Sequence, residues 1–210
     1  LAFSAPLQHR DDHRDTVQRA FGSTRPHTPS HHMSAAKPAP LSLAIPSRAA
    51  LVRMLDEAFH GPAWHGPAVK VALRRVDADT ALWRPGPGRP NVWEQALHIA
   101  LGKHIVAQRL DPATRRHFPV KRTSSWWAPS PTLADADARA KAWAHDLALL
   151  DACHDDLIAT LRRVPLRRLG EQQGPRGVTL GRQVAGMVMH DAYHAGQIAL
   201  VLRLAASVRG

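Results

Sequence analysis

Apolar side chains first recur at helical spacing shortly after residue 46. From Ser47 onward they lie three and four residues apart, and Gly61-Pro62 ends the pattern. The row consists of Leu51, Val52, Leu55, Ala58 and Phe59. The stretch 69–76 has the composition of a further short helix or of a continuation of the first one. We therefore predict a helix from about residue 47 to residue 60.

A second helix is predicted over 91–110. Asn91 is a favourable N-cap, and Glu94 follows it at the spacing of a capping box. The helical pattern stops at Asp111-Pro112, because proline cannot continue a helix. Just before this helix, the Pro- and Gly-rich segment 84–90 excludes regular structure.

Two longer helices are predicted in the second half of the chain. One runs over about 133–163 and is closed by Pro165, and the other runs from its cap at Thr179 to about residue 206. The first has an apolar row with alternating steps of four and three, typical of a bundle seam, in which His154 occupies one step. That row consists of Trp143, Leu147, Leu150, Leu157 and Leu161. Because no alternating strand pattern is found, we predict an all-α fold, an antiparallel four-helix bundle.

The N-terminal stretch differs from the rest of the chain. Residues 1–40 are rich in Pro, His and Ser and have no apolar periodicity, so we expect a disordered tail followed by a bundle domain at 41–210. The first methionine is Met33, and we expect the native chain to start there, which would make the preceding residues non-native.

Composition narrows the function classes. The single cysteine, Cys153, excludes an internal disulfide framework and fits a reducing compartment. No apolar run is long enough for a membrane span, and charges occupy the place of a signal peptide's apolar stretch, so we expect a cytoplasmic protein with no membrane partner. The formal net charge is +11, but the arginines are scattered and no groove-reading motif accompanies them. Nucleic-acid binding is therefore not the expected function.

Three histidines are the candidate chemistry. His190 and His194 lie four residues apart on the last predicted helix, about 6 Å between β-carbons, which lets two imidazoles bind one ion. They share an apolar, inward face with Met187, Ile198 and Val201. His98 on the second helix shares a face with Leu101 and Ile105. One metal ion would satisfy a nitrogen on each ring, but separate hydrogen bonds to carbonyls or water would do so as well, and the pattern leaves both open.

Three segments resemble a known family in the same order. They are GPAWHGPAV at 61–69, RPGPGRPNVWEQALHIALGKHIVAQRL at 84–110, and VTLGRQVAGMVMHDAYHAGQIALVLRL at 178–204. With the long helix between them, the chain is similar over about 47–206 to the DinB-like, YfiT-type four-helix family of metal-dependent enzymes, which is unrelated to the DNA polymerase of similar name. The resemblance implies that His98, His190 and His194 bind a divalent metal ion.

The same resemblance implies a reaction class. In studied relatives a low-molecular-weight thiol attacks an electrophile, so the resemblance implies a thiol-dependent, S-transferase-like enzyme acting on a small-molecule substrate. The implied cofactors are a divalent metal ion (Zn, Ni, Fe or Mn) and a low-molecular-weight thiol. A metal-dependent hydrolase on the same site and a non-catalytic module that binds a metal or small ligand are the alternatives. Relatives are often dimers, so a homodimer is expected.

Three further residues are catalytic candidates. Glu94 lies one turn before His98 and could accept a proton, although its capping position explains it as well. Asp191 could orient a ligand imidazole, or it could be a charge on the helix surface. Gln197, one turn after His194, could bond a bound water or pack between helices.

A few other polar and aromatic residues have less specific interpretations. Trp64 and His65 could line the mouth of a pocket, and residues 126–127, both tryptophan, could cover the open end of the bundle or anchor their loop. His154 is interpreted as a satisfied core histidine, with an approach to the metal as the alternative, and Cys153 as inert. No partner is predicted for His60, His104, His117 or His145.

Overall fold

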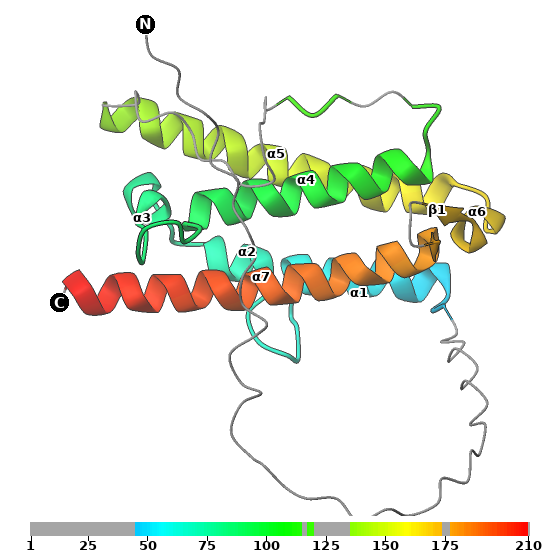
Figure 1. Ribbon diagram of the computed structural model, residues 1–210, viewed down its shortest axis with the longest axis horizontal. Helices are drawn as coiled ribbons and strands as arrows, with labels where there is room; N and C mark the ends of the chain where they lie inside the picture. The colour runs from blue at the N-terminus through cyan, green and yellow to red at the C-terminus, as the bar shows by residue number, and fades with distance from the viewer. Residues whose placement is uncertain (1–44, 115–116, 120–134, 174–176, 210) are drawn as a thin grey trace, which may run out of the picture. The chain divides into compact units, whose positions relative to one another are not determined.

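Four long helices and several short elements make up the computed structural model, which describes residues 45–114, 117–119, 135–173 and 177–209 (Figure 1). The elements are α1 (Arg48–His60), α2 (Val69–Leu73), α3 (Ala78–Leu82), α4 (Val92–Leu110), α5 (Ala136–Arg163), α6 (Arg167–Gly170), β1 (Gln172–Gln173), β2 (Val178–Thr179) and α7 (Leu180–Arg209). The described residues belong to one compact unit, 43–210. The predicted tail, the two tryptophans at 126–127 and the predicted helix start at 133 lie outside the described residues.

The long helices begin at the capping residues that the sequence contains. The Ser47 side chain accepts a backbone N–H of α1 at 3.2 Å. Asn91 and Glu94 form the predicted capping box, with each side chain accepting the other residue's backbone N–H at 2.8 Å. Thr179 Oγ1 accepts a backbone N–H in the first turn of α7 at 3.3 Å. These local signals are confirmed because each depends only on residues three positions apart.

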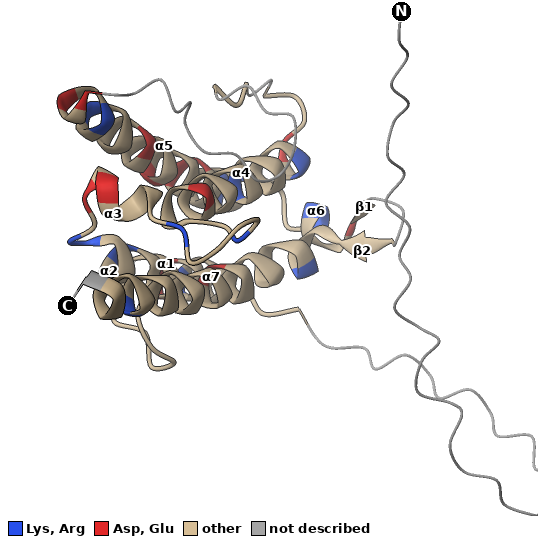
Figure 2. Ribbon diagram, turned by 60° about the vertical axis from the view of Figure 1, so that its left-hand side comes forward, with Lys and Arg blue, Asp and Glu red and all other residues tan. Residues whose placement is uncertain are grey.

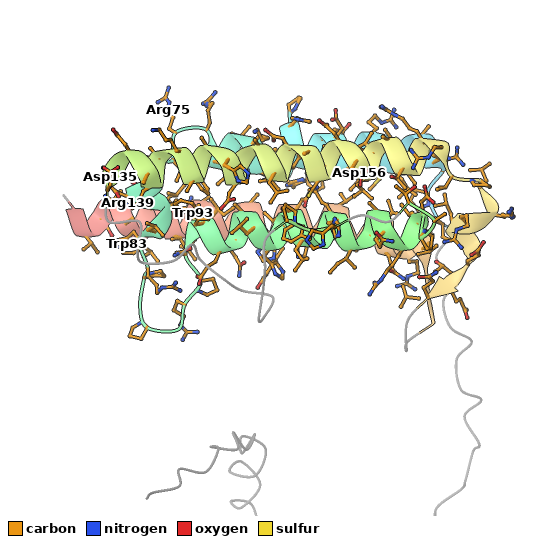
Figure 3. The ribbon with its side chains drawn as sticks, turned by 90° about the horizontal axis from the view of Figure 1, so that it is seen from above. Arg75, Trp83, Trp93, Asp135, Arg139 and Asp156 are labelled. Atoms are coloured by element: carbon orange, nitrogen blue, oxygen red, sulfur yellow. The ribbon has the colours of Figure 1, made fainter. Side chains whose placement is uncertain are left out.

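Helices α4 and α5 lie side by side and run in the same direction (Figures 1 and 3). Near their starts, the indole rings of Trp93 and Trp143 lie 5.0 Å apart. Near their ends, Arg163 donates to the Asp111 carboxylate at 2.8 Å. Residues 111–135 therefore join two helices that begin at the same end of the unit.

The other two long helices, α1 and α7, also run parallel to each other, and the two pairs are antiparallel (Figure 1). Ile45, just before α1, lies against Gly181 in the first turn of α7. Arg109 at the end of α4 donates to Gln183 at the start of α7 at 2.7 Å. Arg48 at the start of α1 donates to a backbone carbonyl at the end of α5 at 2.8 Å. The predicted all-α fold is confirmed. The predicted antiparallel packing holds only between the two pairs, because the two helices within each pair are parallel.

The interior contains two apolar clusters. The first apolar cluster includes Phe59, Trp93, Leu97, Trp143, Leu150 and Ile198. The second apolar cluster includes Leu51, Leu55, Leu110, Leu157, Leu161 and Leu180. The apolar row predicted for the long helix α5 contributes to both, with His154 between the two parts. The core is thus divided along the helix axes.

The short elements were only partly anticipated. The helix considered after the first one is the separate helix α2, because Gly61 has a φ of 87° and breaks the helix before Pro62. Helix α3 was not predicted, and the two-residue strands β1 and β2 pair antiparallel, with Gln172 opposite Thr179. Among the described residues, no helix combines the length and the hydropathy needed to cross a membrane.

Candidate metal centre

The three predicted ligand histidines come together between α4 and α7. One ring nitrogen each from His98, His190 and His194 lies within 4.8 Å of the other two. The ring centroids of His98 lie 5.0 Å from those of both other rings, and the two rings of α7 are 4.4 Å apart. His190 and His194 are close because they lie one turn apart on α7. His98 reaches them because α4 packs antiparallel against α7.

Gly102 lets α7 approach α4 at this level. A Cβ atom built on Gly102 would lie 3.1 Å from Cε of Met187 and 3.4 Å from Cε1 of His190. The first distance is tighter than an ordinary carbon contact and the second lies at its lower edge, so a side chain here would press first on Met187 and then on His190. Glycine at this position therefore makes room for one of the three histidines.

The environment keeps the imidazoles of His190 and His194 neutral. Burial, and then the neighbouring His194 and His98, lower the pKa of His190 to about 3. Burial, and then His98, lower the pKa of His194 to about 4. Neutral imidazole is the form that binds metal ions. In addition, Nδ1 of His190 is buried and has no hydrogen-bond partner among the described residues. The residues present therefore fit a divalent transition-metal ion.

Gln197, one of the catalytic candidates, contacts this site. Its side chain is hydrogen-bonded to His194, and its amide donates to the Tyr193 hydroxyl at 2.8 Å. The Tyr193 ring also packs edge-on against His194, with the centroids 5.0 Å apart. Both residues of α7 thus restrain the orientation of His194, a task that side chains around metal sites commonly perform.

Glu94, the second candidate, is engaged elsewhere. Its carboxylate accepts the backbone N–H of Asn91 at 2.8 Å and two bonds from the Arg84 guanidinium at 2.8 and 2.9 Å. Both oxygens are therefore held at the start of α4. The capping interpretation explains Glu94 fully.

Asp191, the third candidate, is fully buried and forms an ion pair with Lys103 of α4. The alternative of a surface charge is therefore wrong. Lys103 also lies 3.2 Å, Nζ to Nδ1, from His154 of α5. Burial lowers the pKa of Lys103 and raises that of Asp191, while the contact between the two groups opposes both shifts. The pair links α7 to α4 beside His190.

Lys103 was not predicted as a site residue, although the sequence carries a signal for it. Lys103 is the only Lys, Arg, Asp or Glu between Gln95 and Gln108, and Asp191 is the only one between Gln183 and Leu202. In Figure 2, most of the α7 ribbon is accordingly tan, the colour of residues other than Lys, Arg, Asp and Glu. Single opposite charges in two otherwise apolar helices indicate a buried ion pair, because an unpaired charge is too costly to bury.

Six polar residues form a layer between the two apolar clusters. This polar layer consists of His98, Lys103, His154, His190, Asp191 and His194. On each of α4, α5 and α7, it interrupts helix faces that are apolar on both sides. Clusters of ionisable groups within a core are common at functional sites, because catalysis and metal binding use groups whose pKa values burial and neighbouring charges have shifted.

The remaining predicted residues lie outside the three-histidine cluster. His154 belongs to a different group, with Asp56 and His60. Burial raises the pKa of the Cys153 thiol to about 11, which agrees with the inert interpretation. Trp64 is 95% exposed and His65 is exposed next to it, in the connection between α1 and α2.

The fold and the site define an all-α protein with a histidine-lined interior. A family model described as the DinB superfamily matches residues 65–198, well over half of the chain and including all three histidines, and the chain belongs to this superfamily. The family resemblance is thus confirmed. No curated protein and no solved structure matches the chain.

Proposed function

We propose that this protein is a metal-dependent enzyme in which His98, His190 and His194 together bind one divalent cation. The observation that carries the proposal is the convergence of three ring nitrogens within 4.8 Å in the polar layer, where His194 is buried and His98 and His190 are half-buried. Three protein ligands leave coordination positions for a substrate, which is the arrangement of catalytic sites and not of closed structural ones.

The residues of the chain have distinct tasks in this proposal. When bound, a divalent cation supplies a Lewis acid that lowers the pKa of a coordinated thiol or water. Burial lowers the pKa of His190 and His194, so their rings are neutral and leave the charge of the ion undiminished. Gln197 restrains His194, and the Lys103–Asp191 pair holds α7 against α4 next to His190. The ligands are thereby oriented before any ion arrives.

The reaction class that we propose is transfer of a low-molecular-weight thiol to a small electrophile. This part rests on the resemblance to thiol transferases, since the same three-imidazole site would also serve attack by water on an ester or amide. Among Zn, Ni, Fe and Mn, the three imidazoles suit Zn, Ni or Fe better than Mn, which prefers oxygen donors.

Elemental analysis of the purified full chain and of His98→Ala tests the site. We expect His98→Ala to lose one equivalent of metal and its affinity to fall by orders of magnitude, while circular dichroism shows an unchanged helical signal because the apolar clusters are untouched. His145→Ala, an exposed histidine beside Asp146, is the control and should keep its metal. Full metal content in His98→Ala would show that the three-histidine site does not exist.

A screen of thiols with small electrophiles, with and without a chelator, tests the chemistry. Thiol-dependent turnover that the chelator abolishes is the expected result. Hydrolysis of esters or amides without any thiol would replace the transferase by a hydrolase. Bound metal with no turnover of electrophiles, esters or amides would indicate a non-catalytic binding module. Turnover that persists in the presence of the chelator would contradict the proposal.

A further inference from the structure

We propose a second metal site, formed by Asp56 and His60 of α1 and His154 of α5. It shares no residue with the three-histidine site and does not depend on the proposed function. The sequence pattern did not single out Asp56 or His60 and considered His154 only in relation to the three-histidine metal, because this site exists only where α1 packs against α5.

The spacing of the ligand atoms fits one ion. Asp56 and His60 lie one turn apart on α1, with His60 Nδ1 2.9 Å from Asp56 Oδ1. Nε2 of His154 lies 3.8 Å from the same carboxylate oxygen, and one ligand atom from each residue lies within 4.8 Å of the others. Two ligands on a single ion with bonds of about 2.0–2.2 Å are roughly 3–4 Å apart. The 3.8 Å pair falls in that range, and the 2.9 Å pair, which has the length of a hydrogen bond, lies just below it.

The His154 ring is held in the orientation that the site needs. It is 1% exposed and stacks on Phe59, with centroids 4.0 Å apart and ring planes 9° apart. Its Nε2 is buried and has no hydrogen-bond partner among the described residues. An unsatisfied buried nitrogen costs about 1–3 kcal/mol, and a cation bound by Asp56 and His60 would satisfy it.

The other ring nitrogen of His154 faces Lys103 at 3.2 Å. This contact holds the ring from its buried side and leaves Nε2 facing Asp56.

Access and donor chemistry define the class of ligand. The side chains of His60 and Asp56 are 46% and 59% exposed, so an ion can reach the site from solvent and keep water on its open side. Two imidazoles with one carboxylate suit zinc, iron(II), cobalt and nickel, whereas calcium and magnesium prefer oxygen donors alone. The expected ligand is a divalent transition-metal ion.

Calorimetric titration of the metal-stripped full chain with Zn²⁺ tests this site. We expect His60→Ala and Asp56→Asn each to lose one equivalent, or to lose at least about tenfold in affinity for it. His98→Ala should lose a different equivalent, and the double variant His60→Ala/His98→Ala should lose both. The histidines before residue 45 are present in every variant, so their binding cancels in the differences.

The control is His145→Ala. His145 is exposed, with Nδ1 3.2 Å from Asp146 Oδ1, and neither residue belongs to a three-ligand group found in the described parts of the chain. It should therefore keep the stoichiometry of the parent. Substituting Co²⁺ for Zn²⁺ gives a second readout, since loss of His60 should remove one component of the visible absorption. Unchanged stoichiometry, affinity and absorption in His60→Ala would overturn the second site, whether or not His98→Ala loses metal.

Discussion

Lys103 of α4 and Asp191 of α7 form an ion pair in which neither side chain is exposed to solvent. Removing two charges from water is expensive, so such a pair adds little stability compared with apolar residues of similar volume. It does impose one relative position on the two helices, because any other register would leave a buried charge alone. In this protein that register is the one in which His98 meets His190 and His194.

Replacing Lys103 with methionine should lower the free energy of unfolding by about 3–5 kcal/mol, because it leaves the Asp191 carboxylate buried and unpaired. The double variant Lys103→Met/Asp191→Leu should recover most of that loss, as measured by urea denaturation. We expect its metal affinity to stay reduced, since the register is no longer specified. Parent-like metal binding in the stable double variant would restrict the pair to a structural role.

Glu94→Ala should lower the free energy of unfolding by about 1 kcal/mol, because it removes half of the capping box. Its metal affinity should be unchanged, since both carboxylate oxygens are bound at the start of α4. Asn91→Ala, which removes the other half of the box, is the matched comparison. Weaker metal binding in Glu94→Ala but not in Asn91→Ala would place Glu94 in the site.

Gly102→Ala should weaken metal binding at the three-histidine site by roughly tenfold or more, because the added carbon would crowd Met187 and His190. Gly186→Ala is the control, since a Cβ there meets nothing within 4 Å and the exchange should stabilise the helix by about 0.5–1 kcal/mol. Calorimetry and thermal unfolding of both variants separate the two effects. Equal metal affinity in the two variants would show that Met187 and His190 accommodate the added carbon without disturbing the site.

The metal-free protein should lose stability as the pH falls from 6.5 towards 3. Burial, and then Lys103 and His60, lower the pKa of His154 from 6.5 to about 3. Between these pH values the imidazole is protonated in the unfolded chain and neutral in the folded chain. At pH 5 this group alone accounts for about 2 kcal/mol, and above pH 6.5 it contributes nothing. His154→Gln should flatten the pH dependence by that amount in urea denaturation at pH 7 and 5. His145→Ala should leave it unchanged.

Helix α7 presents large apolar side chains to solvent, and we expect them to form a homodimer contact. These exposed residues are Met189, Tyr193, Leu200, Leu204 and Val208. Light scattering at micromolar concentration should give twice the chain mass of 23.0 kDa. Leu200→Glu should shift the protein to the single-chain mass while the helical signal persists. A parent protein already at the single-chain mass would contradict this expectation.

The sequence by itself determined those features that depend on short spacings. Helix starts at Ser47, Asn91 and Thr179 follow from side chains that bond to backbone groups three residues away, and these bonds form in any fold that allows the helix. The pairing of His190 with His194 follows in the same way from one turn of helix. The inclusion of His98 needed the family resemblance, because no local rule relates it to α7.

Only the tertiary structure decided which distant residues meet. The parallel direction of α4 and α5 is seen only in the contacts at their starts and ends, and the sequence between the two helices carries no signal of it. Lys103, His154 and Asp56 come from three helices, and their contacts depend on the relative rotation and register of those helices. Helical periodicity shows which face of a helix is buried, but it does not show what lies opposite that face, because that depends on packing against the other helices.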